Sequence, residues 1–349
     1  MKDSLGVENA LRLFPDQILE CWKQAYSFDI PQFSPKAVVI SGMGGSSNAA
    51  KILEGLYEED FKVPFDIDIH NDYELPIWVK EDTLVVANSY SGNTEETLSS
   101  VEAAQKVSAK IIGVTTGGKL KEMIQAKQID GVFVDDSRVN PSHLPKVGLG
   151  VSFGALAGTL AKMGVLKLNE KELQDALDEL NEVRKMWLPE IEETDNPAKQ
   201  IAKWLYGYVP VLFGGRPLLG SLNAGRNVMC EVSRVFTLFF DFPEVNHVLV
   251  EATQKPDIVK EKFKYLFFIS NFNHPRVLIR YKVTAEILTK QGLAFKDYQL
   301  KGSSKLTQAL ELPHFCAWVA FYLSVLAGTD PGPEPWIVEL KNKLSQPVH

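Results

Sequence analysis

The chain has 349 residues, of which 45% are hydrophobic and 23% charged, and its formal net charge is −7. A typical single domain has ~100–200 residues, so we expect two domains, each with a sizeable core of its own. The globular composition excludes a largely disordered chain, and no block of Lys and Arg breaks the mixed charge pattern. We therefore expect neither nucleic acid nor a membrane as a partner, and any anionic ligand must be bound locally.

The cysteines are few and far apart in the sequence. Cys21, Cys230 and Cys316 form no C-x-x-C pair, which excludes a disulfide framework and a thiolate zinc site. The N-terminal residues mix acids with apolar side chains and do not resemble a signal peptide. The most apolar late stretch, Phe315–Ala327, is too short to span a bilayer. These features predict a reduced, soluble, cytoplasmic protein.

The first half of the chain alternates short β-rich runs with segments of helical spacing. This alternation predicts a parallel sheet with helices on both faces, because right-handed crossovers place the helices there. The runs are nearly continuous in Val, Ile and Leu, as expected for strands that are buried on both sides. The predicted strands lie within Ala37–Gly45, Phe65–Leu75, Asp82–Gly92, Lys110–Gly118 and Gly131–Asp136, and the helical segments include Ser47–Glu58 and Thr94–Ser108.

The middle of the chain predicts two helices and a boundary. Gly150–Gly164 is small and apolar, which indicates a buried helix. Asn169–Trp187 has an apolar stripe among charges and begins with a capping box of Asn169 and Glu172. We therefore predict an N-terminal domain over 1–165, a helical connector over 166–197 and a C-terminal domain over 198–349.

The pattern then restarts in the second half. The first predicted strand of each half runs into glycines, in SGMGGSS and FGGRPLLGS, which favours two similar αβα units. The predicted strands are Tyr208–Gly215, Val235–Phe240, Tyr265–Ser270 and Phe295–Leu300, and the predicted helices include Pro275–Gln291 and Pro335–Leu344.

Two loops rich in hydroxyl groups follow neighbouring predicted strands. They are Ser41–Asn48 (SGMGGSSN) and Asn88–Thr97 (NSYSGNTEET). Ligands of open α/β sheets bind at the carboxyl ends of strands, where helix N-termini offer free N–H groups. One such loop alone is as easily an ordinary capped turn, but two side by side favour an anion site that needs no lysine.

Neither loop matches a known nucleotide motif. The P-loop sequence G-x-x-x-x-G-K-[ST] is absent. A dinucleotide loop requires a third glycine where Ser47 stands, although Asp72 could serve as the acidic residue after the second strand. A dinucleotide-dependent oxidoreductase is therefore disfavoured.

A third region of interest is Cys230–His247, in which Glu231 and Glu244 are candidate bases and His247 titrates near neutrality. On residue chemistry alone, such glutamates and histidines are more often structural. Nothing in the pattern singles out Glu231 or His247.

Taken together, these three regions resemble the sugar isomerase (SIS) domain proteins, and more narrowly the bifunctional phosphoglucose/phosphomannose isomerases. The motifs are GMGGSS at Gly42–Ser47, SYSGNTEET at Ser89–Thr97, and Glu231 followed sixteen residues later by the His of PEVNH. The tail Thr329–Lys341 agrees as well. The resemblance implies two tandem SIS-type three-layer αβα domains with flavodoxin-like parallel sheets.

The resemblance also implies roles for particular residues. Glu231 is the expected base that moves a proton between C1 and C2, and His247, reaching in from a partner subunit of a homodimer, is expected to help open the sugar ring. Lys341 is expected to assist ring opening, with a register uncertain by a few residues. The phosphate-binding residues implied are Gly44, Gly45, Ser46, Ser89, Ser91 and Thr94.

One position departs from the family pattern. Lys146, in HLPKVGLG, stands where the family usually has an Arg that steadies the enediolate. Lysine keeps the positive charge but lacks the planar bidentate fork, which puts turnover rate and substrate range in question. The Asn residues typical of the family near the catalytic Glu are reduced to Asn223 and Asn227.

These residues suit aldose–ketose isomerisation of a phosphosugar, between glucose 6-phosphate or mannose 6-phosphate and fructose 6-phosphate. A carboxylate in a partly dry pocket has a raised pKa, which suits proton shuttling. We expect no cofactor and no metal, because no clustered His/Cys/Asp ligand set is visible. The alternative is a non-catalytic SIS sensor that binds a phosphosugar, which the Lys146 departure leaves open.

Overall fold

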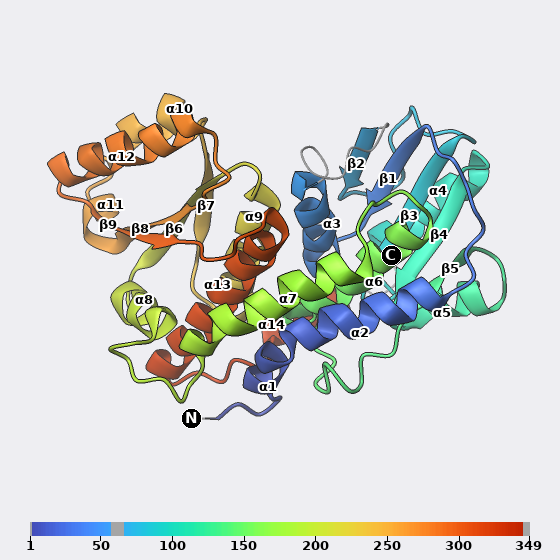
Figure 1. Ribbon diagram of the computed structural model, residues 1–349, viewed down its shortest axis with the longest axis horizontal. Helices are drawn as coiled ribbons and strands as arrows, with labels where there is room; N and C mark the ends of the chain where they lie inside the picture. The colour runs from blue at the N-terminus through green and yellow to red at the C-terminus, as the bar shows by residue number, and fades with distance from the viewer. Residues whose placement is uncertain (1, 57–65, 345–349) are drawn as a thin grey trace.

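The computed structural model describes residues 2–56 and 66–344, which form two parallel β-sheets with layers of helices on both faces (Figure 1). One sheet has five strands and belongs to the first half of the chain, and the other has four strands and belongs to the second half. The predicted α/β fold of two αβα units is therefore confirmed.

The first sheet has the strand order β2-β1-β3-β4-β5, the flavodoxin-like order, and all its strands are parallel. Its strands are β1 (Ala37–Ser41), β2 (Asp66–His70), β3 (Thr83–Ser89), β4 (Lys110–Thr115) and β5 (Asp130–Phe133). The run predicted over Phe65–Leu75 is too long. Phe65 lies outside the described residues, and the strand ends at His70 because the polar sequence Asn-Asp-Tyr-Glu that follows turns the chain.

The helices of the first half divide between the two faces of this sheet. The outer face packs against α4 (Glu95–Lys106) and α5 (Gly118–Gln125). The inner face packs against α2 (Phe14–Ser27), α3 (Gly44–Leu56) and α6 (Leu149–Lys162), and the short α1 (Val7–Arg12) precedes them. Of the predicted helix Ser47–Glu58, the last two residues lie outside the described part.

The second sheet repeats this plan with the strand order β7-β6-β8-β9. Its strands are β6 (Val209–Gly215), β7 (Leu238–Phe242), β8 (Phe263–Ile269) and β9 (Ala294–Gln299). Helices α10 (Val245–Ala252) and α12 (Pro275–Lys290) cover the outer face, and α11 (Ile258–Lys262) leads into β8. The inner face packs against α8 (Pro197–Leu205), α9 (Leu219–Val228) and α13 (Lys305–Ala327).

The hydrophobic core differs from the expected pair of separate cores. Alternate strand residues point to opposite faces, so Val38 packs inward while Val39 packs outward, and Leu212 and Phe213 do the same in β6. The two outer faces have their own clusters, but both inner faces share one continuous core. The halves meet closely because α3 and α9 pack side by side, and a Cβ on Gly220 would lie 2.1 Å from the Lys51 carbonyl oxygen.

Helix α13 runs through this shared core and is longer than the apolar stretch singled out in the sequence. The stretch Phe315–Ala327 is only its second half, because the Ser304 hydroxyl caps the helix ten residues earlier by accepting the Thr307 N–H at 3.0 Å. The whole helix is long and apolar enough to cross a membrane by length and composition, but 89% of its most apolar window is buried inside the protein. It is a core helix.

The predicted amphipathic helix in the middle of the chain is α7 (Glu170–Arg184), which lies along α2 and α13 (Figure 1). The capping box is confirmed: the Asn169 side chain accepts the Glu172 N–H at 3.0 Å, and the Glu172 carboxylate accepts the Asn169 N–H at 3.2 Å. The apolar stripe of α7 packs into the shared core. The domain boundaries at 165 and 197 remain a prediction.

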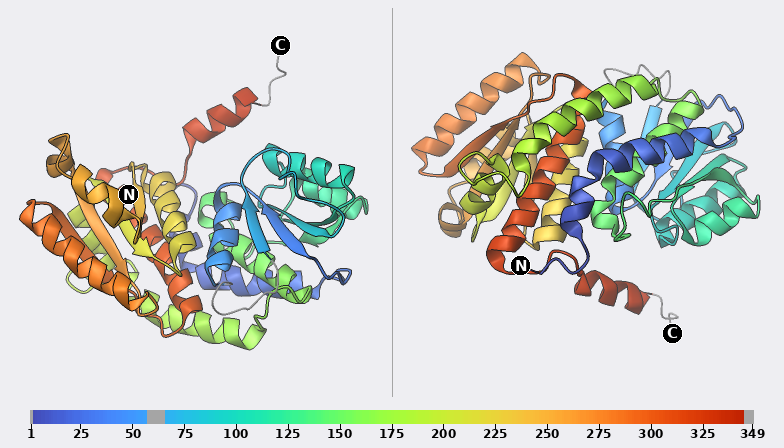
Figure 2. Two further views of the ribbon diagram at one scale, coloured as in Figure 1. Left: turned by 90° about the horizontal axis from the view of Figure 1, so that it is seen from above. Right: turned by 60° about the horizontal axis from the view of Figure 1, so that its bottom comes forward.

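The C-terminal helix α14 (Pro335–Leu344) projects from the body of the protein and has no buried residue (Figure 2). The segment before it is held at its base. The Arg234 guanidinium donates hydrogen bonds to the carbonyl oxygens of Asp330 at 3.0 Å and Pro333 at 2.6 Å. These contacts fix the segment from which α14 starts.

Candidate active site

A pocket of about 630 Å³ lies where the two hydroxyl-rich loops, the turn that carries Lys146 and helix α14 meet. It brings together residues that are far apart in the sequence, and most of the predicted site residues line it. The predicted site residues in its wall are Gly44, Gly45, Ser46, Ser91, Thr94, Lys146, Glu231 and Lys341. Ser89 and His247 are not among them.

The first loop enters the pocket at the N-terminus of α3. Gly44 has a φ of +52°, a left-handed conformation that favours glycine, and it begins the helix directly after β1. The Ser46 hydroxyl lines the pocket and accepts the Tyr90 N–H at 3.1 Å, which ties the two loops together. The first N–H groups of a helix have no partner within it, so this end of α3 suits an anion.

The second loop ends at the N-terminus of α4. Ser91 and Thr94 line the pocket, whereas Ser89 is only 2% exposed and lies behind them. The Ser89 hydroxyl pairs with the Thr94 hydroxyl at 2.9 Å and accepts the Gly92 N–H at 3.1 Å. Ser89 therefore shapes the loop in this structure and does not reach the pocket.

Glu231 lies at the opposite wall, on a π-helical turn, Met229–Ser233, that continues α9. Such turns displace one residue from the regular helix and recur at functional sites. Burial and the nearby carboxylate of Glu334 raise the pKa of Glu231 to about 7, against the opposing charges of Lys146, Arg226 and Lys341. A carboxyl with this pKa exchanges protons readily near neutral pH.

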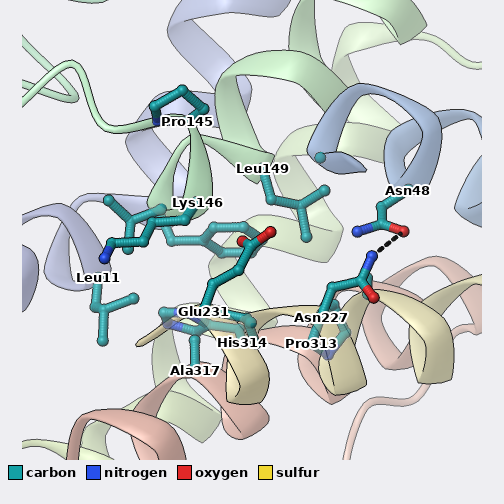
Figure 3. Close-up of a pocket in the computed structure, with 15 residues that line it drawn as sticks. Leu11, Asn48, Pro145, Lys146, Leu149, Asn227, Glu231, Pro313, His314 and Ala317 are labelled. Atoms are coloured by element: carbon teal, nitrogen blue, oxygen red, sulfur yellow. Dashed lines mark hydrogen bonds between the residues drawn. The ribbon is translucent and has the colours of Figure 1, made fainter. Parts of the chain in front are cut away.

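Lys146 is held in place by the C-terminal segment. Its side chain is 1% exposed, and its ammonium donates to the Pro331 carbonyl oxygen at 2.7 Å and lies 3.9 Å from the Glu334 carboxylate. Burial lowers the pKa of Lys146 below its usual value. In Figure 3 the ammonium points away from the Glu231 carboxylate, so it acts on that group across a gap and not by direct contact.

The two remaining catalytic candidates lie in different settings. Lys341 faces the pocket from α14, while the nearby Lys343 is paired with Glu339 at 2.6 Å, so the structure favours Lys341 over its neighbour in the tail. His247 is exposed on α10, at the outer side of the second sheet, and lines neither the pocket nor the smaller cavity described next.

A smaller cavity continues inward from Glu231 and contains residues that the sequence did not single out (Figure 3). Asn48 lies in its wall. The side-chain oxygen of Asn48, Oδ1, accepts hydrogen bonds from the side chains of Asn223 at 2.8 Å and Asn227 at 3.2 Å. These bonds join α3 to α9 across the two halves. His314, from α13, lines the same cavity. Only the meeting of α3, α9 and α13 brings these residues together.

Tyr90 was likewise overlooked, although it stands within the SYSGNTEET motif. Its hydroxyl donates to the Asp136 carboxylate and accepts from the Asn140 amide at 2.7 Å. Asp136 and Asn140 lie at the start of the loop that carries Lys146. This network links the second hydroxyl-rich loop to the position of Lys146.

In residues 2–56 and 66–344, no group of three or more His, Cys, Asp or Glu side chains is arranged to hold a metal ion.

Comparison with known proteins identifies relatives over nearly the whole chain. A family model described as the bacterial phospho-glucose isomerase C-terminal SIS domain matches residues 194–344. A bifunctional phosphoglucose/phosphomannose isomerase from Caldicellulosiruptor bescii is 31% identical over 339 residues, which cover 95% of this chain and 97% of the relative. The Aquifex aeolicus protein of the same name is 33% identical and covers 89% of this chain and 91% of the relative. The chain belongs to the bifunctional phosphoglucose/phosphomannose isomerase family.

Solved structures confirm the fold of this family member. The tagatose-6-phosphate ketose/aldose isomerase from Escherichia coli superposes with a TM-score of 0.70 at 12% identity, covering 96% of this chain and 98% of that structure. A glucose-6-phosphate isomerase like protein from Thermus thermophilus gives a TM-score of 0.58 at 19% identity, covering 96% and 99%. At these identities the likeness concerns the fold alone.

Proposed function

We propose that this protein is an aldose–ketose isomerase that interconverts glucose 6-phosphate, mannose 6-phosphate or both with fructose 6-phosphate. The observation that carries the proposal is Glu231, a half-buried carboxyl with a pKa of about 7, in a pocket whose wall also contains two hydroxyl-rich helix N-termini. The names of the relatives support the same substrates.

The phosphate group would bind at the first-half wall of the pocket. Ser46, Ser91 and Thr94 offer hydroxyl donors, and Gly44 and Gly45 allow close approach of the backbone at the start of α3. These groups are neutral, so they can bind the phosphate without forming an ion pair with the Glu231 carboxylate. Binding at a group remote from the reacting carbons fixes the orientation of C1 and C2.

Glu231 would then act as the base. Its carboxylate removes the proton from C2 of the open-chain aldose, the C1=O electron pair moves to O1, and an enediolate forms. The proton of the O2 hydroxyl passes to O1, the C1=C2 electron pair takes the proton from protonated Glu231 at C1, and the pair left on O2 forms the C2 carbonyl of the ketose. The positive charge of Lys146 favours the enediolate oxygen electrostatically. Each step of this reaction is a proton transfer accompanied by a shift of π electrons, so we propose that the reaction uses no cofactor.

Ring opening must precede proton transfer, because the substrates are cyclic in solution. We propose that Lys341 and His247 assist this step, His247 from the partner subunit of a homodimer. His247 is exposed and outside the pocket of its own chain, as such an arrangement requires. We also infer that the protein works in the cytoplasm, where phosphosugars are metabolised.

The direct test is turnover of each sugar phosphate in a coupled assay, run in D₂O. We expect fructose 6-phosphate from at least one aldose phosphate, with deuterium incorporated at C2 of aldose that re-forms from the ketose. Turnover with no solvent label under any condition would contradict the enediol route and indicate hydride transfer. Binding of a phosphosugar without turnover would indicate a sensor instead.

The shared site is tested by mixing two inactive variants. Glu231→Gln and His247→Ala each lack one group, and a mixed dimer would restore one complete site out of two. Random mixing then predicts about a quarter of the wild-type activity, because about half of the dimers are mixed. If mixed dimers form and stay inactive, the two residues do not complete one site across subunits.

A further inference from the structure

His314 is a buried histidine that the proposed reaction does not use. It lies in the middle of α13 with 1% of its surface exposed. Its ring stacks on Phe14 with centroids 4.5 Å apart, and the ring of Trp187 lies at 63° to it with centroids 5.5 Å apart. Its Nε2 accepts a hydrogen bond from the indole N–H of Trp318 at 3.4 Å. The ring is therefore held on three sides in one orientation.

The other ring nitrogen, Nδ1, is buried and has no hydrogen-bond partner among the described residues. Burial lowers the pKa of His314 well below its usual value, and the nearby charge of Arg184 lowers it further, so the ring is neutral. Because a neutral imidazole carries one proton and Nε2 is an acceptor, the proton lies on Nδ1. A buried N–H donor without an acceptor costs roughly 1–3 kcal/mol, so an acceptor is expected.

The small cavity beside His314 can supply that acceptor. About 30 Å³ of it is open to water-sized molecules, which is room for one or two waters and too little for a sugar. Most of its wall is apolar, but Glu231, Asn48 and Asn227 lie in it together with His314 (Figure 3). A buried water needs two to four polar partners, and these side chains provide them.

We propose that a water molecule in this cavity bridges the Nδ1–H of His314 to the carboxylate of Glu231, which makes His314 a positioning residue for the base. The proposal rests on the proposed function only in taking Glu231 as the base. A donor that reaches the carboxylate favours its ionised form. His314 therefore acts in the same direction as Lys146, Arg226 and Lys341, and against burial and Glu334.

The first test measures the ring itself in the wild-type protein. In ¹⁵N NMR of labelled histidine, we expect His314 to be neutral and protonated on Nδ1, with no titration between about pH 5.5 and pH 9. An Nε2-protonated ring, or a ring that titrates in this range, would overturn the proposal. This measurement requires neither substrate nor activity.

The second test measures the pKa of Glu231 by ¹³C NMR of the labelled carboxyl in matched variants. His314→Phe keeps an aromatic ring against Phe14 but removes the donor, and we expect the pKa of Glu231 to rise by about half a unit to one unit. Trp187→Phe disturbs the same aromatic cluster but keeps the Trp318 N–H on Nε2 and therefore Nδ1–H in place, so the pKa should stay within about 0.2 units of wild type. Equal shifts in both variants, or none in His314→Phe, would contradict the bridge.

Two further readouts separate failure of this proposal from failure of the proposed function. His314→Asn places an amide nitrogen near the position of Nδ1, so it should restore the lower pKa and keeps the test available if His314→Phe does not fold. In the isomerase assay, the acid limb of kcat/KM should move to higher pH by the same amount as the NMR pKa. A shifted pKa in a protein with no isomerase activity would contradict the function and leave the bridge standing.

Discussion

Two glutamates of the second half, Glu231 and Glu311, have similar pKa values but different surroundings. Burial raises the pKa of each to about 7. Glu311, on α13, is 0% exposed, and its carboxylate accepts the N–H groups of Lys301 and Gly302 at 2.9 Å and the Tyr298 hydroxyl at 3.1 Å. Within the described part of the chain, no hydrogen bond holds the carboxylate of Glu231, which instead lines a pocket.

The difference teaches that a raised pKa does not by itself identify a catalytic base. The acceptor positions of Glu311 are filled by donors that connect β9 to α13, so this carboxyl holds a loop. Glu231 has access to a ligand, and its charge is set at a distance by Lys146 and Glu334.

The largest effect is expected from matched amide substitutions. Glu231→Gln removes the only proposed base, and we expect kcat to fall by about 10²–10⁴-fold. In Glu311→Gln the amide oxygen still accepts the two backbone N–H groups, so kcat should stay within about threefold of wild type. Steady-state kinetics with the preferred aldose phosphate measures both, with melting curves to confirm folding. Comparable losses of kcat in two folded variants would break the contrast.

A smaller loss is expected when the charge of Lys146 is removed. Lys146→Met should lower kcat by about 10–10³-fold, because the enediolate loses a favourable charge. The acid limb of the pH profile should also move to higher pH, because the positive charge that lowers the pKa of Glu231 is gone. Lys23→Met, which removes an exposed lysine paired with Glu170, is the control. An unchanged pH profile in Lys146→Met would contradict the electrostatic role.

The two glutamates also predict how stability depends on pH. Each folded-state pKa is raised, so each carboxyl favours folding most below its unfolded pKa of about 4.3, and this contribution is lost as pH rises through about 7. Wild-type unfolding free energy should therefore fall between about pH 4 and pH 7.

Denaturant unfolding of the amide variants tests this directly. At pH 8, Glu231→Gln should be more stable than wild type by about 1–3 kcal/mol, because it removes a partly desolvated charge close to the carboxylate of Glu334. Glu311→Gln should gain less, because the carboxylate oxygen that accepts the Tyr298 hydroxyl is replaced by an amide NH₂ group, which cannot accept. Equal gains would show that the hydrogen bonds of Glu311 do not distinguish it.

The smallest effect is expected at the phosphate wall. Ser91→Ala removes one exposed hydroxyl that lines the pocket, and KM should rise about three- to tenfold with little change in kcat. Ser27→Ala removes a hydroxyl on α2 that bonds only to the Gln24 carbonyl oxygen and is the control. A fall in kcat with constant KM would place Ser91 near the reacting carbons and not at the phosphate.

Much of the fold was predictable because it depends on local patterns. Continuous Val and Ile runs identified the strands within a few residues, and the Asn169–Glu172 capping box marked the start of α7. The errors arose where tertiary contacts decide. The two expected cores are joined on their inner faces, and the apolar stretch from Phe315 belongs to a longer helix whose start is set by Ser304.

The candidate site divides in the same way. Ser46, Ser91 and Thr94 follow strands directly, so their common edge could be inferred from the topology of a parallel sheet. Ser89 stands in the same motif but turns behind the loop, because its hydroxyl is used by Gly92 and Thr94. No pattern in the sequence pointed to His314, because a histidine in an apolar helix is ordinarily a packing residue.

By itself, the sequence determined the alternation of strands and helices, the two hydroxyl-rich loops and the motifs of the family, because these depend on neighbours along the chain. Only the tertiary structure decided that Glu231 is half-buried with a pKa of about 7, that Lys146 is held by the Pro331 carbonyl and that His314 shares a cavity with Glu231. Burial and electrostatics depend on every group within a few ångströms, and those groups come from both halves of the chain.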